Sequence, residues 1–126
     1  MSDQKTVLVV GQNLFFLPRI QNAATPQGYN VLQTRTDADF RDSFQEDTTA
    51  LVLVDLEGNP DEWPKVVQGL RGEDKASVKV IAFGPHSDEA GMAKARELGC
   101  DLVISKGEFS RDMVNILAEA VDAGRG

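Results

Sequence analysis

The chain has 126 residues, of which 41% are hydrophobic and 26% charged, as in one soluble globular domain. Thirteen Lys and Arg against twenty Asp and Glu give a net charge of -7, and the basic residues are scattered, so we expect no binding to nucleic acid. The sequence shows no signal peptide and no run long enough to cross a membrane, and its single cysteine, Cys100, cannot form an internal disulfide. We therefore expect a single cytoplasmic domain over residues 1–126, with its core at about 6–123.

Five short apolar runs predict β-strands. Four of them, at residues 6–10, 50–54, 78–83 and 102–104, consist largely of Val, Ile and Leu. The first three show no alternation with polar residues, which is typical of strands covered on both faces, as in parallel sheets. The fifth run, at 30–34, mixes apolar and polar residues and is predicted to be an edge strand.

Helical segments are predicted between the strands. Because Pro18 and Pro64 are tolerated only in a first turn, we expect the first helix to begin near Phe16 and the third near Glu62, with Asp61 as its cap. Asp37 is predicted to cap the second helix, which contains Ala38, Phe40 and Phe44.

The last two helices have recognisable ends. Ser87 is predicted to cap the fourth helix, which continues to Leu98 and stops at Gly99. Ser110 is predicted to cap the final helix. We expect Val114, Leu117 and Val121 to form one apolar stripe of that helix. We expect the helix to end at Gly124.

The strand–helix unit occurs five times, which predicts a three-layer α/β fold: a doubly wound, five-stranded parallel sheet with helices on both faces. In such sheets, ligands bind at the carboxyl ends of the strands. Four predicted strands end at Gly11, Asp55, Gly84 and Lys106, so these residues should converge at one edge.

Two of these strand ends support a family resemblance. The strand ending V-L-V-D at Asp55 and the strand ending V-I-S-K at Lys106 resemble the receiver domain of two-component response regulators, over residues 6–123. The resemblance implies the flavodoxin-like fold with strand order 2-1-3-4-5. It also implies that Asp55 occupies the phosphoacceptor position and Lys106 the position of the lysine that contacts the phosphoryl group.

Other positions depart from the family pattern. Gly11 and Gln12 stand where the family has an acidic pair that helps to hold Mg²⁺. Gly84 stands at the position of a Ser or Thr, and Val103 at that of an aromatic switch residue. The resemblance therefore implies a degenerate site, or pseudo-receiver.

Phosphoryl transfer to a carboxylate depends on Mg²⁺ to neutralise the developing negative charge. Mg²⁺ prefers several hard oxygen ligands, so Asp55 with one backbone carbonyl is a poor site. We expect no metal and no cofactor. A weak Mg²⁺ site formed by Asp55 and Glu57 is the alternative.

Further residues have competing interpretations. Residues 14–16, Leu-Phe-Phe, could form an exposed docking patch or an apolar lid, or could make core contacts. Trp63 could anchor a partner or pack its helix on the sheet. His86, without metal-ligating neighbours, is predicted to occupy a loop, and Cys100 to fill apolar space.

The leading hypothesis is a stand-alone, non-enzymatic signalling domain of a two-component type pathway that acts by protein–protein contact, without phosphorylation. Its partner would be a histidine kinase or a downstream signalling protein. It would be a monomer, or a homodimer through the face formed by the fourth and fifth helices and the fifth strand. The alternatives are an atypical receiver phosphorylated on Asp55 and a sensor that binds a small ligand at the carboxyl edge of the sheet.

Overall fold

The computed structural model describes residues 5–12, 16–72 and 76–125, with side chains described up to residue 119. Its sheet has five parallel strands in the order β2-β1-β3-β4-β5. The strands are β1 (Thr6–Val10), β2 (Asn30–Thr34), β3 (Thr49–Asp55), β4 (Lys79–Gly84) and β5 (Leu102–Ser105). The predicted fold class and strand order are confirmed.

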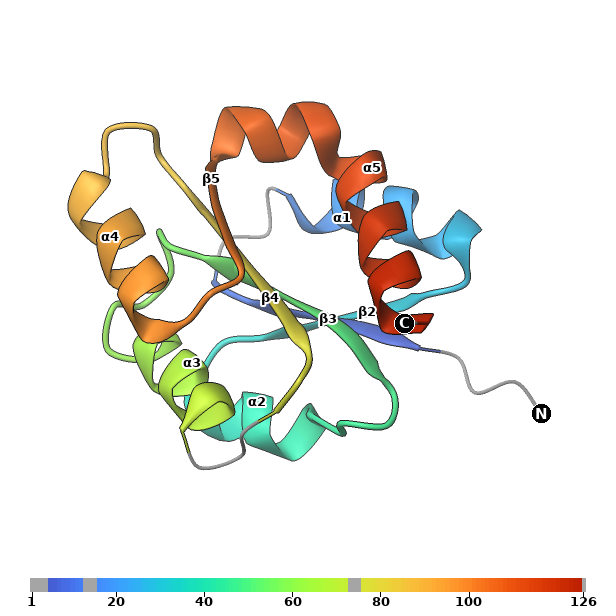
Figure 1. The fold of residues 1–126 in the computed structure, drawn as a ribbon, viewed down its shortest axis with the longest axis horizontal. Helices are drawn as coiled ribbons and strands as arrows, with labels where there is room; N and C mark the ends of the chain where they lie inside the picture. The colour runs from blue at the N-terminus through green and yellow to red at the C-terminus, as the bar shows by residue number, and fades with distance from the viewer. Residues whose placement is uncertain (1–4, 13–15, 73–75, 126) are drawn as a thin grey trace.

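Helices cover both faces of the sheet and complete three layers (Figure 1). One face carries α1 (Leu17–Ala24), which continues into the short 3-10 helix η1 (Thr25–Gln27), and α5 (Lys106–Arg125). The other carries α2 (Asp37–Ser43), α3 (Trp63–Arg71) and α4 (Glu89–Leu98).

Alternate residues of the central strands enter two separate hydrophobic cores, which explains the absence of polar alternation in the sequence. In β3, Leu51 and Leu53 face α1 and α5, whereas Val52 and Val54 face the other three helices. All four side chains are almost fully buried.

The helices that contain proline begin close to the predicted residues. Pro18 and Pro64 each lie in a first turn, where the missing N–H breaks no helical hydrogen bond. Asp61 does not cap α3, because the cap position is Glu62. The Glu62 carboxylate instead accepts a hydrogen bond from the backbone N–H of Asp37, at 2.7 Å. Trp63 is buried in the core, as its packing interpretation predicts.

Two other predicted caps are wrong by one residue. Thr36, not Asp37, caps α2 by accepting a hydrogen bond from the N–H of Asp39 at 3.0 Å. Asp88, not Ser87, caps α4 by accepting one from the N–H of Gly91 at 3.0 Å. Each pair contains two adjacent residues with good capping side chains, and the path of the preceding loop selects between them.

The start of α5 differs most from the prediction. Ser105, not Ser110, caps the helix: its hydroxyl accepts a hydrogen bond from the N–H of Glu108 at 3.1 Å and donates one to the Glu108 carboxylate at 3.4 Å. The first of these bonds is the usual N-cap interaction, in which a serine hydroxyl accepts from the N–H three residues later. As a result α5 begins at Lys106, immediately after β5.

The apolar stripe of α5 is also displaced. Val114 is 60% exposed, and the buried side chains are Phe109, Met113, Ile116 and Leu117. The helix continues past Gly124 to Arg125. Val121 lies beyond the described side chains. At the end of α4, Gly99 adopts a left-handed φ of 108°, which confirms the predicted stop.

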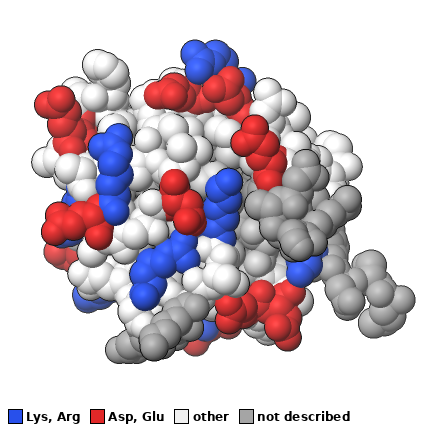
Figure 2. Space-filling model, viewed as in Figure 1, with Lys and Arg blue, Asp and Glu red and all other residues white. Residues whose placement is uncertain are grey.

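Figure 2 shows Lys and Arg interspersed with Asp and Glu on the face viewed. Within the described residues, no helix combines the length and apolarity needed to span a bilayer.

Candidate functional site

Asp55 is the last residue of β3, and its side chain is enclosed by the loop that follows. The residue is 3% exposed. Its Oδ1 accepts a hydrogen bond from the N–H of Glu57 at 2.9 Å, and its carbonyl accepts one from the N–H of Gly58 at 2.9 Å. The turn after β3 therefore closes over the carboxylate rather than leaving it at an open mouth.

Lys106 reaches this carboxylate from the first residue of α5. Its ammonium is paired with the Glu57 carboxylate and lies 3.6 Å from Asp55 Oδ1. A cation in the first turn of a helix opposes the helix dipole. The two carboxylates compensate, so the predicted pair exists and is extended by Glu57 into a three-residue cluster.

Burial raises the pKa of Asp55 above its usual value. The hydrogen bond from the Glu57 N–H and the nearby Lys106 ammonium oppose this change, and the Glu57 charge reinforces it. The cost of removing the carboxylate from water is the largest of these effects. Ionisation of Asp55 therefore lowers the stability of the folded state, even though Lys106 lies beside the carboxylate.

Asp55→Asn should make stability less sensitive to pH. Because the folded-state pKa is raised, the folded protein holds this proton more tightly than the unfolded chain does. Wild-type stability should thus fall as pH rises from the unfolded-state pKa through the folded-state pKa. Urea unfolding from pH 4 to pH 8 should show the variant gaining stability relative to wild type over this interval. A constant difference across the series would contradict the prediction.

Gly11 lies so close to Asp55 that a larger residue does not fit. A Cβ atom at Gly11 would be 2.9 Å from Asp55 Cβ, and one at Gly58 would be 3.3 Å from Gly11 Cα. Gln12, the other half of the predicted degenerate pair, is exposed. The Asp55 side chain at the end of β3 therefore lies where the Cβ of an acidic residue at position 11 would be.

Gly11→Asp should not restore an ion site. The added Cβ should collide with the Asp55 side chain and force the ends of β1 and β3 apart, and we expect a loss of about 1–3 kcal/mol in unfolding free energy. Gln12→Asp adds the same charge at an exposed position and serves as the control, with an expected change below about 0.5 kcal/mol. Thermal unfolding with and without Mg²⁺ measures both effects. Mg²⁺-dependent stabilisation of Gly11→Asp would refute the prediction.

Gly84, the last residue of β4, lies similarly close to the Leu56 side chain. A Cβ there would be 3.0 Å from both Cβ and Cδ1 of Leu56. Leu56 is buried, and its N–H donates a hydrogen bond to the Phe83 carbonyl at 2.9 Å. A Ser or Thr side chain at position 84 would have to displace Leu56, so apolar packing takes the place of a hydroxyl.

Val103 is half-buried and packs against the core on the α2, α3 and α4 side of the sheet. Three phenylalanine rings pack together on the opposite side. Phe83 and Phe109 stack with ring centroids 4.2 Å apart and planes at 5°, and the Phe16 ring lies edge-on to both. Phe109 was absent from the predicted apolar stripe of this helix, although its spacing from Met113 and Leu117 is helical.

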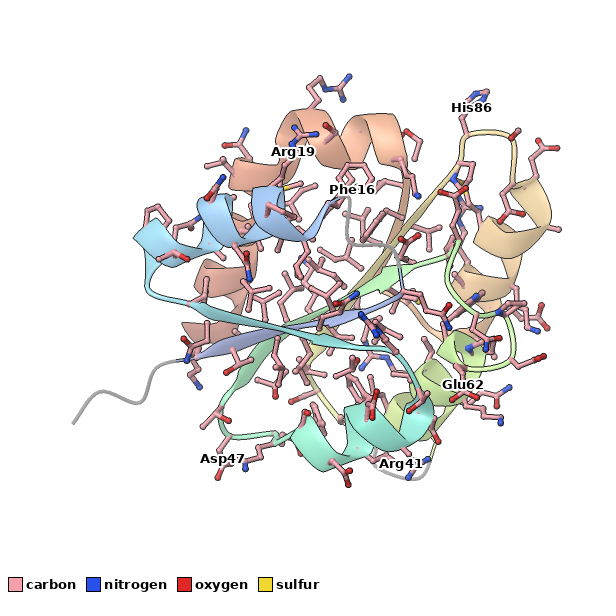
Figure 3. The ribbon with its side chains drawn as sticks, turned by 180° about the vertical axis from the view of Figure 1, so that it is seen from behind. Phe16, Arg19, Arg41, Asp47, Glu62 and His86 are labelled. Atoms are coloured by element: carbon pink, nitrogen blue, oxygen red, sulfur yellow. The ribbon has the colours of Figure 1, made fainter. Side chains whose placement is uncertain are left out.

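Phe16 is therefore a core residue rather than part of a docking patch. It is 9% exposed, and the Lys106 ammonium lies 5.5 Å from its ring centroid. Figure 3 shows Phe16 between the start of α1 and the first turns of α5. Leu14 and Phe15 lie outside the described residues.

His86 occupies the exposed loop between β4 and α4, as predicted, and points away from the molecule in Figure 3. Cys100 is half-buried against the core, and burial raises the pKa of its thiol to about 11. It therefore remains a protonated, unreactive thiol at neutral pH.

The oxygen donors at the site do not match what Mg²⁺ requires. Asp55 and Glu57 supply the only carboxylates in the cluster described above, and the Lys106 ammonium already lies against both. Mg²⁺ needs a near-octahedral shell of oxygen atoms. Among the described residues, no group of three or more His, Cys, Asp or Glu side chains could hold a metal.

Comparison with solved structures finds proteins of the same fold. The matches include a response regulator receiver domain protein (CheY-like) from Methanospirillum hungatei JF-1, with a TM-score of 0.77, 18% identity and 96% of each chain covered. They also include the receiver domain of the TMAO respiratory system response regulator TorR, with a TM-score of 0.78, 22% identity, and 93% of this chain and 96% of that one covered. The chain has the receiver-domain fold.

A third receiver structure, that of the BeF3-activated DrrB receiver domain from Thermotoga maritima, has a TM-score of 0.76 at 18% identity and covers 94% of this chain and 98% of that one. No family model and no curated protein matches the chain. At these identities the likeness establishes the receiver fold, and any activity has to be argued from the site itself.

Proposed function

We propose that this receiver-fold domain is a non-enzymatic signalling module of a two-component type pathway that acts through protein–protein contact, without Mg²⁺-dependent phosphorylation. The observation that supports this most directly is the closure around Asp55. The Asp55 Cβ would be 2.9 Å from a Cβ at Gly11, and the Leu56 side chain would be 3.0 Å from one at Gly84. The positions that would supply an ion ligand and a phosphoryl-binding hydroxyl are thus replaced by packing.

Lys106 gives independent support. In a phosphoacceptor site, a lysine is useful when its charge can meet an incoming phosphoryl oxygen. Here the ammonium is paired with Glu57 and lies 5.5 Å from the centroid of the Phe16 ring. An incoming phosphoryl group would have to break this pairing without a bound metal to offset its own negative charge.

The proposed contact surface is the face formed by α4, β5 and α5. β5 is an edge strand, and Leu102 at its start is 39% exposed. The side chains of Arg96 on α4 and Arg111 on α5 are exposed, and Arg111 is paired with Asp112. An open strand edge with an exposed apolar residue, on a face that also carries exposed charged side chains, would suit a partner protein, a histidine kinase or downstream component, or a second copy of this chain.

An atypical phosphoacceptor is the competing function, and the position of Asp55 favours it. The carboxylate ends β3 and lies 3.6 Å from the Lys106 ammonium. The small-ligand sensor has less support, because its proposed apolar wall includes Phe16, which is buried in the core.

Crosslinking capture tests the proposal with three variants. Wild type and Asp55→Asn should capture the same protein partner with equal efficiency, because the contact does not require phosphorylation. Arg96→Glu and Arg111→Glu should reduce capture, since both reverse charge on the proposed face. Loss of capture in Asp55→Asn, with capture retained in both arginine variants, would overturn it.

A further inference from the structure

β2 is one of the two edge strands of the sheet, and its outer edge is uncovered. It lies at the end of the strand order and pairs with β1 along its whole length, Asn30–Thr34. In Figure 3, which shows the molecule from behind, β2 crosses between α1 and α2, and no helix passes in front of it. One edge of this strand is therefore free to accept another strand.

The free edge presents the backbone groups of Val31 and Gln33. On the other edge, the Asn30 N–H donates to the carbonyl of Lys5, just before β1, at 2.9 Å. Successive residues of a strand direct their N–H and C=O groups to opposite edges, so every second residue of β2 faces β1. The N–H and C=O groups of Val31 and Gln33 therefore point outward, where no described residue pairs with them.

β2 carries none of the features that usually keep an edge strand from pairing. Its sequence, Asn-Val-Leu-Gln-Thr, has no charged residue and no proline, and its register with β1 has no bulge. Leu32, at the centre of the strand, is 46% exposed. It lies on the α2 side of the sheet, because its register partner Leu8 belongs to the core on that side. An exposed leucine on an uncharged edge favours pairing with another strand.

The charge distribution favours a second copy of this chain as that strand's source. The net charge is -7 and 26% of the residues are charged, yet residues 20–34 contain no charged residue. They form the end of α1, all of η1 and all of β2. Two copies of so acidic a chain repel each other, but pairing through this segment brings no like charges within it into contact. A partner recognised by charge would find none there to pair with.

We propose that two copies of this chain dimerise through antiparallel pairing of their β2 strands. A twofold axis at Leu32 places Val31 of each copy opposite Gln33 of the other, and each such pair exchanges two backbone hydrogen bonds. The two Leu32 residues form the central pair, with Cα atoms about 4.5 Å apart and side chains on the same face. This register satisfies the outward backbone groups and covers the exposed leucine.

The dimer joins the two sheets into one continuous sheet. Because β2 and β5 lie at opposite ends of the strand order, the face formed by α4, β5 and α5 stays open on each copy. The inference therefore goes beyond the proposed function and gives the module two such faces. A single pair of short strands buries less surface than the roughly 1,600 Å² of a standard interface, so we expect the dimer only at high protein concentration.

Sedimentation velocity at concentrations up to the near-millimolar range tests the proposal. Wild type should change from monomer to dimer as its concentration rises. Leu32→Lys places two ammonium groups opposite each other at the twofold axis and should weaken dimerisation about tenfold or more. Val114→Lys makes a similar change at an exposed apolar residue of α5 and should dimerise like wild type. Both side chains are exposed, so neither replacement disturbs the core.

Amide hydrogen exchange of wild type, followed by NMR, locates the contact without any variant. The amides of Val31 and Gln33 should exchange about tenfold more slowly once about nine-tenths of the protein is dimeric, whereas that of Leu32, which faces β1, should not change. Wild type that stays monomeric at every concentration would overturn the proposal and leave a strand of another protein as the occupant of this edge. Dimerisation that survives in Leu32→Lys, or that does not slow exchange at Val31 and Gln33, would overturn it as well.

Discussion

Lys106→Met is expected to lower the unfolding free energy by about 2–3 kcal/mol at neutral pH, because it leaves the buried Asp55 carboxylate without its cation. Methionine has an unbranched side chain like the lysine stem, so the loss should arise mainly from charge. The effect should shrink at acid pH, where Asp55 becomes protonated. Urea denaturation followed by Trp63 fluorescence measures it.

Two controls separate the contributions of the carboxylates. Glu57 is about half exposed, so Glu57→Gln should cost less than about 1 kcal/mol. In the double variant Asp55→Asn with Lys106→Met, the buried charge is gone and most of the lost stability should return. Equal losses in the Lys106→Met single variant and the double variant would show that Asp55 is not the group Lys106 stabilises.

Phe109→Ala should be more damaging, with an expected loss of about 3–5 kcal/mol. Phe109 is completely buried and stacked on Phe83, and Phe16 lies edge-on to both rings. Removing the ring opens a cavity at the junction of α1, α5 and β4. Urea denaturation provides the measurement.

Val114→Ala is the matched control on the same helix. Val114 is 60% exposed, so its truncation should change stability by less than about 0.5 kcal/mol. If Phe109→Ala and Val114→Ala had similar effects, the buried stripe assigned to α5 would be wrong.

The sheet was predictable because its signals are local. The runs of Val and Leu that form β1 and β3 have strand length and lack alternation, and the structure places their side chains in two cores. Pro18 and Pro64 located the starts of α1 and α3, since backbone geometry restricts proline to the first turn.

The helix caps were less predictable because several residues compete for each one. Thr36 lies beside Asp37, and Asp88 beside Ser87, and both members of each pair have suitable side chains. Ser105 both ends β5 and caps α5, whereas Ser110 was expected to cap the helix. Choosing Ser110 moved the expected start of α5 and left Phe109 out of the predicted core.

The site was only partly predictable from the sequence. The order of the strands brings Asp55 and Lys106 together, and this followed from the repeated strand–helix pattern. The pairing of Lys106 with Glu57, and the contacts of Gly11 with Asp55 and of Gly84 with Leu56, depend on how closely the end of β3 and the loop after it approach their neighbours. Nothing in the local sequence encodes those distances.

Intact mass measurement after incubation with acetyl phosphate and Mg²⁺ tests the central claim most directly. A standard receiver domain treated in parallel shows that the conditions transfer a phosphoryl group. The closed site around Asp55 predicts that this chain keeps its unmodified mass throughout the time course. A phosphoryl adduct on the wild type that disappears in Asp55→Asn would contradict the account and establish Asp55 as a phosphoacceptor.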